Sequence, residues 1–432
     1  MRTEQFSDAL NLLNDDIIEE TGRIRNGLGQ KNRRKGWRQR AVAAVCAACA
    51  AGAACWGIWV FFQQEMGHTA DNSGFLAGAS GDLANREQGL PLLSIPEESA
   101  DAMGYEGYMA YDISELVNGN PWREDMALSA LPVFKNPLSY NENHIASGAD
   151  FVKMREILVE TAGRLGLDKD SLEVTDNAPD EEKRKIITEK MGGEVPEGYF
   201  NPTELKVQGE GLKIAVDQTM TAVVSFEPEV ELPGEYRFAV HSTYDDMVKA
   251  ADYLENAYGD FIGMENPRKD ISGGDYNIYF QQAYTVGFYD GDGDEVSRIF
   301  NYNFYRTEFY GNEEGKLFLA RSFQPDLSQK VGDYPIIAVE KAKELLLNGS
   351  YITTVPYEIP GGDYVKKVEL IYRTGRTEQY FMPYYCFYVE LPEAAREKEA
   401  WAGELKTYGA YYVPAVESEY IANMPLWDGG MN

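Results

Sequence analysis

Three aspartates at alternate positions are the residues whose types and spacing best fit a chemical role. The stretch FYDGDGDEV at 288–296 places Asp290, Asp292 and Asp294 at the 1-3-5 positions that supply oxygen ligands to calcium in an EF-hand loop. The rest of that pattern fails, because Glu295 stands where the loop needs glycine and the bidentate glutamate at position twelve is missing. Asp-Gly is also a strong turn signal. We therefore expect a hairpin turn, with a weak calcium site as the alternative.

Signatures of catalysis or of zinc binding are missing from the sequence. The three histidines, His68, His144 and His241, have neither HExxH nor histidine–cysteine spacing. There is no GxSxG, no P-loop and no dinucleotide fingerprint. Adjacent acids such as Asp245 and Asp246 identify no glycosidase pair in a chain with 70 acidic residues. We predict no enzyme, no catalytic residue and no cofactor, with a wall-directed hydrolase that uses unidentified carboxylates as the less favoured alternative.

The predicted elements that would position these residues occur in a repeated order, in which one helix is followed by several strands. Helical periodicity predicts helices at 148–165, 180–191, 243–258 and 338–347. Alternation and turn signals predict strands at 204–208, 212–217, 220–226, 236–241, 276–289, 297–324, 364–373, 380–390 and 408–415. This order indicates an α+β fold of about three helix-plus-antiparallel-sheet units.

The segment 41–62 is uncharged and follows a basic stretch that ends at Arg40. Twenty-two residues are enough to cross a bilayer as a helix, and the positive-inside rule leaves the preceding residues in the cytoplasm. We therefore expect a cytoplasmic arm at 1–40 and one transmembrane helix in the lipid bilayer at 41–62. A cleaved signal peptide or a lipoprotein signal is the alternative for this segment.

Small residues form one stripe on the expected transmembrane helix. Ala44, Ala48 and Gly52 are spaced by four residues, which lets another helix approach closely. The sequence therefore predicts a membrane protein partner that packs against this stripe. The alternative is that alanine is merely tolerated there.

The rest of the chain is acidic and carries no nucleic-acid footprint. The net charge is −30, and the first 40 residues contain nine basic and six acidic residues, so the residues after the helix carry −33. Such a surface favours solubility, or a basic partner or cations. We divide these residues into a linker at 63–100 and α+β units at 101–241, 242–330 and 331–432.

The N-terminal stretch resembles a leader that occurs on many uncharacterised membrane proteins of gut clostridia. The resemblance covers residues 6–60 and rests on FSDALNLLNDDIIEE, a basic stretch, a tryptophan and an Ala/Cys-rich run. This leader precedes different ectodomains. The resemblance implies a Gram-positive plasma membrane with the ectodomain in the wall space.

The C-terminal part is similar in order to the YycI/YycH regulators, over residues 332–415. The similarity rests on GDYPIIAVEKAKELLLNGSYI, VKKVELIYR, EQYFMPYYCFYVELP and TYGAYYVPAV. It implies a single-pass protein that restrains a wall-sensing histidine kinase. Tyr384 and Tyr385 stand where those proteins have a tryptophan, so no functional residue is carried over. PepSY-like domains have similar patterning and would imply inhibition or peptide binding.

These observations predict a single-pass plasma-membrane protein with a cytoplasmic N-terminus. Its extracellular C-terminal ectodomain would bind, and would sense or modulate a membrane signalling partner. The alternative is a tethered wall-space module that binds peptide, glycan or cations.

Overall fold

The structure is a computed structural model that describes residues 89–96, 105–140, 145–239, 241–375, 377–392 and 403–429. All of these residues belong to the unit Gln63–Asn432. They form α-helices and antiparallel sheets, so the predicted α+β class is confirmed for the described part of the chain.

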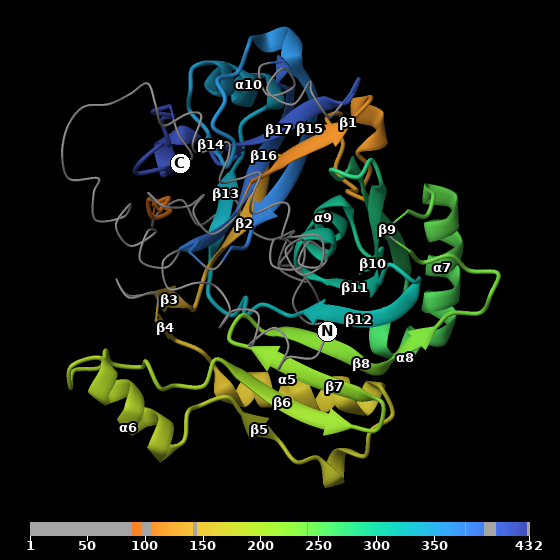
Figure 1. The fold of residues 1–432 in the computed structure, drawn as a ribbon. Helices are drawn as coiled ribbons and strands as arrows, with labels where there is room; N and C mark the ends of the chain where they lie inside the picture. Colours follow the sequence, from red (N-terminus) through yellow and green to blue (C-terminus); the bar gives the residue numbers. More distant parts are fainter. Residues whose placement is uncertain are drawn as a thin grey trace, which may run out of the picture. The chain divides into compact units, whose positions relative to one another are not determined.

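An eight-stranded sheet contains strands from the middle of the sequence (Figure 1). In spatial order its strands are β5 (Thr175–Asp176), β6 (Glu204–Gly209), β7 (Leu212–Asp217), β8 (Thr221–Glu231), β12 (Lys316–Phe323), β11 (Arg306–Gly311), β10 (Gln282–Asp290) and β9 (Pro267–Tyr276). Side chains on a strand point alternately to the two faces. Accordingly Ile214 and Val216 of β7 are fully buried, whereas Ala215 between them is only partly buried.

Three helices cover one face of the eight-stranded sheet: α5 (Phe151–Arg164), α7 (Tyr244–Ala257) and α8 (Gly259–Ile262). Helix α5 packs against β6 and β7, and α7 packs against β9 and β10 (Figure 1). Asp150 caps α5, because its carboxylate accepts hydrogen bonds from the N–H groups of Val152 and Lys153, both at 3.0 Å. Helix α6 (Glu181–Lys190) has no buried side chain and stands away from the sheet in Figure 1.

A seven-stranded sheet combines strands from both ends of the described chain. Its strands are β1 (Gly107–Ala110), β17 (Lys406–Pro414), β16 (Tyr380–Glu390), β2 (Ala130–Lys135) and β13 (Lys330–Pro335), with β14 (Ile352–Thr353) beside β17 and β15 (Val365–Arg373) beside β16. Helix α10 (Val339–Leu347) packs against β17. The short strands β3 (Ser139–Tyr140) and β4 (Ala146–Ser147) form a separate pair.

The described residues also contain four short 3₁₀ turns. They are η1 (Ile113–Glu115), η2 (Lys169–Ser171), η3 (Gly362–Tyr364) and η4 (Ser418–Tyr420). The four predicted helices are present as α5, α6, α7 and α10, with bounds that differ from the predicted ones by at most three residues.

Part of the predicted strand at 297–324 is wrong, because its first residues form helix α9 (Glu295–Phe304). Phe300, Tyr302 and Phe304 alternate as in a strand, but Phe300 and Phe304 are also four residues apart and share one face of a helix. Asp294 begins the helix, since its carboxylate accepts a hydrogen bond from the N–H of Ser297 at 2.8 Å. The remaining residues form β11 and β12.

The expected three separate helix-plus-sheet units are replaced by two main sheets in the described residues. Strand β8 of the first expected unit pairs with β12 of the second, with Val224 opposite Ala320. Strand β2 of the first unit likewise pairs with β13 and β16 of the last. Backbone groups of strand edges need partners, and here those partners come from distant parts of the sequence.

The segment 116–120, which we call the clasp, lies against one edge strand of each main sheet. Val117 exchanges two backbone hydrogen bonds with Gly273 of β9, both at 3.0 Å. The side-chain amide of Asn120 donates to the carbonyl of Leu370 in β15 at 3.1 Å. The clasp therefore occupies backbone groups at both edges, which would otherwise be open to pairing with another chain.

The end of the expected linker at 63–100 is part of the fold where the structure describes it. Leu93 is fully buried and Ile95 is 5% exposed. Leu93 forms a parallel bridge with Ile421. Residues 89–96 therefore add to the core of the seven-stranded sheet.

The prediction of a membrane-spanning protein needs correction. Among the residues that the structure describes, no helix is both long and apolar enough to cross a membrane. The segment 41–62, on which that prediction was based, lies outside the described residues, as do the arm and the stripe of Ala44, Ala48 and Gly52.

Candidate functional site

Four tyrosines from separate elements form a group that we call the tyrosine patch: Tyr111, Tyr244, Tyr276 and Tyr284. The rings of Tyr111 and Tyr276 meet edge to face, with centroids 5.3 Å apart and an interplanar angle of 80°. The rings of Tyr244 and Tyr284 are 6.1 Å apart at 73°. Tyr276 and Tyr284 lie on paired strands, since Gln282 of β10 is opposite Tyr276 and Tyr284 is opposite Gly273 of β9. Burial raises the pKa of Tyr276, and nearby Glu115, Tyr111 and Tyr284 raise it further.

The tyrosine patch is positioned by contacts between β1, β9, β10 and α7. Tyr111 follows β1, Tyr276 ends β9, Tyr284 lies in β10, and Tyr244 is the first residue of α7. Strand β9 packs against β1 and α7. Glycine is required at position 274, because a Cβ there would lie 1.8 Å from the carbonyl oxygen of Glu115.

Part of the tyrosine patch is open to solvent. Tyr111 is 46% exposed and Tyr244 is 44% exposed. The adjoining turn between β9 and β10 adds Tyr279 and Phe280, which are 56% and 47% exposed. Phe280 has a φ of 59°, a left-handed conformation that is strained for an aromatic residue. Exposed, adjacent aromatic side chains of this kind are typical of interaction surfaces.

Two carboxylates lie near the tyrosine patch, and one of them, Glu115, also belongs to the capping box of η1 and accepts a hydrogen bond from the N–H of Tyr111 at 2.8 Å. Burial raises the pKa of Tyr284, and the charges of Glu115 and Asp275 raise it further. Burial also raises the pKa of Asp275 to about 6. Within the described residues Asp275 forms no ion pair. No Lys or Arg of that part of the chain stacks on any of the four rings, although such stacking occurs elsewhere in it.

The three aspartates singled out from the sequence lie at the end of β10 and in the loop that leads to α9, so the predicted hairpin turn is wrong, because a helix and not a second strand follows. Asp290 accepts a hydrogen bond from the N–H of Asp292 at 3.0 Å, and Asp292 accepts one from the side chain of Asn266 at 2.9 Å. Asp294 caps α9. In the described residues, no group of three or more His, Cys, Asp or Glu side chains is arranged to hold a metal ion.

A buried ionic group that sequence reasoning missed lies on the face of the eight-stranded sheet opposite α5 and α7. Arg306, 6% exposed, pairs with fully buried Asp270 and with Glu308, the latter at 2.9 Å. The hydroxyl of Tyr310 donates to Glu308 at 2.7 Å. Both carboxylates have partners in the protein, so this group offers no unpaired carboxylate to a ligand.

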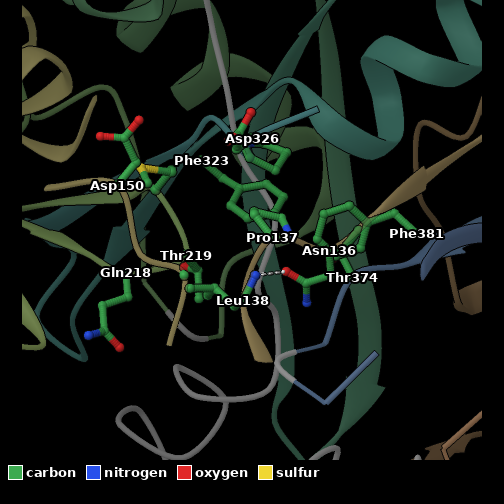
Figure 2. A pocket seen from close by; sticks show the side chains of 13 residues that line it. Asn136, Pro137, Leu138, Asp150, Gln218, Thr219, Phe323, Asp326, Thr374 and Phe381 are labelled. Carbon is green, nitrogen blue, oxygen red and sulfur yellow. Dashed lines mark hydrogen bonds between the residues drawn. The ribbon is translucent and has the colours of Figure 1, made fainter. Parts of the chain in front are cut away.

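A shallow pocket lies where β8 and β12 meet the loops beside β2 and α5. Figure 2 shows Pro137 and Phe323 in its lining, together with Asp150 and Gln218. The space holds about one water molecule. The carboxylate of Asp150 is already used to cap α5. The pocket is therefore too small, and its polar groups too occupied, to be the main binding site.

The tyrosine patch could not be identified from the sequence. Its members lie at four places along the chain, and they meet because β1 packs against β9 and α7 packs against β10. The signals present in the sequence were the 29 tyrosines and the aromatic run in NIYFQQAY at 277–284. These signals indicate a folded core as readily as a surface.

No protein-family model matches this chain, and no curated protein matches it. Among solved structures, the chain is similar to an uncharacterized protein from Eubacterium rectale ATCC 33656. The two are 11% identical, the match covers 70% of this chain and 86% of that chain, and the TM-score is 0.31. A likeness at this level carries no argument about function. The resemblances to the clostridial leader and to the YycI/YycH regulators stay predictions.

Proposed function

We propose that this protein acts by binding rather than by catalysis, and that the tyrosine patch receives a basic segment of a partner protein. The observation that supports this most is that Glu115 lies near Tyr276 and Tyr284, and Asp275 near Tyr284, while no Lys or Arg of the described residues stacks on a ring of the patch. A lysine or arginine side chain from a partner would supply the missing charge.

The charge of the chain favours such a partner. The net charge is −30, so a basic segment is attracted over the whole surface and an acidic one is repelled. Asp275 is desolvated and has no ion pair among the described residues, so a cation beside it regains favourable Coulomb energy.

The geometry of the rings favours a cation over a flat sugar ring. Tyrosine faces carry negative electrostatic potential and attract ammonium and guanidinium groups within about 6 Å of the ring centroid. The two pairs are inclined at 80° and 73°, so they form walls rather than one flat platform. Walls of this kind surround a cationic side chain. A pyranose ring would need a coplanar surface.

The predicted regulatory role fits the same site, with a signalling protein as the basic partner. That role stays a prediction. Binding at the tyrosine patch requires only the described residues, so it can be tested without knowing the partner.

The test is titration of the full-length protein with a ten-residue lysine peptide, using a glycine–serine peptide of equal length for comparison. We expect the lysine peptide to bind, with an affinity that falls as salt increases. Tyr111→Ala combined with Tyr244→Ala should weaken that affinity about tenfold, which corresponds to two cation–π contacts of about 0.5–1 kcal/mol each.

Tyr199→Ala is the matched control, because Tyr199 is 44% exposed like Tyr244 but lies outside the tyrosine patch. If the double variant and the control bind the peptide equally, the peptide binds elsewhere on the acidic surface and the proposal is wrong. Binding of a neutral glycan, with no binding of the lysine peptide, would contradict the cationic ligand class.

Asp275 adds a pH dependence to this binding. Its pKa of about 6 means that the carboxyl is mostly charged at pH 7.5 and mostly neutral at pH 5. Affinity for the lysine peptide should therefore fall as the pH decreases through 6. Asp275→Asn should bind more weakly at pH 7.5 and lose most of that dependence.

A further inference from the structure

At the clasp, the side chains of Asn118 and Lys367 both contact one carboxylate oxygen of Glu369. Oε1 of Glu369 accepts a hydrogen bond from the side-chain amide of Asn118 at 2.7 Å. The same oxygen pairs with Nζ of Lys367 at 2.6 Å. The amine of a lysine and the amide of an asparagine are therefore held side by side, with a carboxylate between them.

We propose that Lys367 and Asn118 form an intramolecular isopeptide bond, with Glu369 as the group that moves the protons. Nζ of Lys367 would bond to Cγ of Asn118, and the bond from Cγ to Nδ2 would break with release of ammonia. The step needs no oxidant, reductant or co-reactant. It is independent of the function proposed for the tyrosine patch.

Glu369 is placed to move each proton that the reaction requires. Its carboxylate takes a proton from the Lys367 ammonium, which leaves a neutral amine whose lone pair attacks Cγ of Asn118. Glu369 then gives the proton to the departing Nδ2, which it already contacts, and accepts the second proton from Nζ. That second proton leaves with ammonia as ammonium, so a lysine ammonium and an amide become a substituted amide and an ammonium ion.

The carbonyl of Asn118 is held for attack. The backbone N–H of Asn120 donates to Oδ1 of Asn118 at 3.1 Å, which stabilises negative charge on that oxygen as the amine adds. Nζ of Lys367 also donates to the carbonyl oxygen of Leu116 at 2.8 Å. These contacts fix both reacting groups and reduce the entropy cost of bringing them together.

Glu369 is the most buried of the three side chains, whereas the side chain of Lys367 is 28% exposed. Glu369 is 6% exposed, and its second oxygen accepts a hydrogen bond from the hydroxyl of Tyr388 at 3.2 Å. Nζ of Lys367 lies 5.3 Å from the ring centroid of the same tyrosine. Tyr388 thus covers the carboxylate and the amine together. The carboxylate that moves the protons is therefore shielded from water, whereas Lys367 is only partly shielded.

The bond would fix the clasp covalently to β15 of the seven-stranded sheet. Asn118 lies in the clasp, next to Val117, which pairs with β9 of the eight-stranded sheet. Lys367 lies in β15 of the seven-stranded sheet. A cross-link here would keep the clasp on β15, while the contact of the clasp with β9 would still consist of hydrogen bonds.

The test is mass spectrometry of the purified full-length protein. We expect its mass to be about 17 Da below the sequence mass, which corresponds to one ammonia. Trypsin should then yield a branched peptide that joins residues 87–123 to residues 367–373, because a Lys367 in amide linkage is no longer a cleavage site. Fragmentation should place the branch at Asn118 and Lys367.

Glu369→Gln should fold, since glutamine can keep hydrogen bonds at this position, but it should retain the full mass for its sequence. Lys367→Arg should do the same. Lys366→Ala is the matched control, because Lys366 is adjacent and pairs with Glu390 instead, and it should still show the mass loss.

Two outcomes would overturn the proposal. The first is a full-length protein at its sequence mass. The second is a loss of about 17 Da without a branched peptide, which would indicate cyclisation of Asn118 with the following Gly119. Circular dichroism of each variant separates failure to fold from failure to react.

Discussion

Glu106 is a residue whose protonation affects the stability of the fold. It precedes β1 and is partly buried. Its carboxyl accepts hydrogen bonds from Tyr412 at 2.8 Å and from Thr354 at 3.2 Å. Burial raises its pKa from 4.5 to about 7, although these bonds and the charge of Arg373 oppose the shift. The folded state therefore holds this proton more tightly than the unfolded chain does.

The sign of the pH dependence follows from this difference. Between about pH 4.5 and pH 7 the folded protein binds more protons at this site than the unfolded chain, so its contribution to the free energy of unfolding falls as pH rises. In the unchanged protein, Glu106 should lower the free energy of unfolding by up to about 1.4 kcal/mol for each pH unit in this range. Glu106→Gln should lack this decrease. Urea unfolding of both proteins from pH 4.5 to 8 measures this. Asp275 titrates in a similar pH range in both the unchanged protein and the variant, so the difference between their free energies of unfolding reports on Glu106. If this difference does not change with pH, the prediction is contradicted.

At the scale of elements, the loop between β10 and α9 shows how one sequence pattern can serve two purposes. The alternate aspartates suit a calcium loop by spacing, but Asp294 accepts hydrogen bonds from the N–H and the hydroxyl of Ser297 at 2.8 and 2.7 Å. These bonds lower its pKa. The carboxylate therefore stabilises the start of a helix.

Asp294→Ala should lower the free energy of unfolding by about 1 kcal/mol, the usual cost of losing such a cap. Asp292→Ala is the control, because Asp292 is exposed and its carboxylate bonds one side chain, Asn266. Urea unfolding compares the two variants. If millimolar calcium raises the melting temperature of the unchanged protein, and both variants lose that effect, these aspartates form a calcium site instead.

Helices were easier to predict from this sequence than strands, for a local reason. Helix α5 has an apolar stripe, Asp150 at its start and Gly166 just after its end, all readable within 20 residues. Helix α9 was missed because Phe300 and Phe304 satisfy both a strand and a helix period. Strand β1 pairs with β17, whose sequence position is about 300 residues away, and no local pattern encodes that pairing. The tyrosine patch depends on such distant contacts and was missed with them.

At the scale of the whole molecule, the clasp makes the unfolding of one sheet depend on the other. The N–H of Gly119 donates to the buried carboxylate of Asp270 in β9 at 2.5 Å, and the neighbouring Asn120 bonds β15. A Cβ at position 119 would lie 3.0 Å from that carboxylate oxygen and 3.1 Å from the backbone of β9, so the clasp or β9 would have to shift by a few tenths of an ångström. An isopeptide bond at Asn118 would add about 5 kcal/mol to the free energy of unfolding, if its effect on the entropy of the unfolded chain equals that of a disulfide closing a loop of the same length.

Gly119→Ala should therefore destabilise both sheets together, by about 1–3 kcal/mol as for other overpacked sites. Hydrogen exchange should rise in peptides from β9 and from β15 alike. Gly234→Ala is the control, because a Cβ at position 234 meets no atom within 4 Å. Faster exchange confined to β9 would show that the sheets open independently.

The pairing of Leu93 with Ile421 brings two distant positions of the chain to one point. The N–H of Leu93 donates to the carbonyl of Tyr420, and the N–H of Ala422 donates to the carbonyl of Leu93, both at 2.8 Å. When the two attachment points of a folded unit lie next to each other, the unit can be inserted into a surface loop of another protein. Neither protein then has to change its backbone to make the connection. The same point is where a circularly permuted chain could be closed. A stretching force applied at these two positions would act on the bridge between Leu93 and Ile421. The two sheets would not lie on the path between the points of attachment.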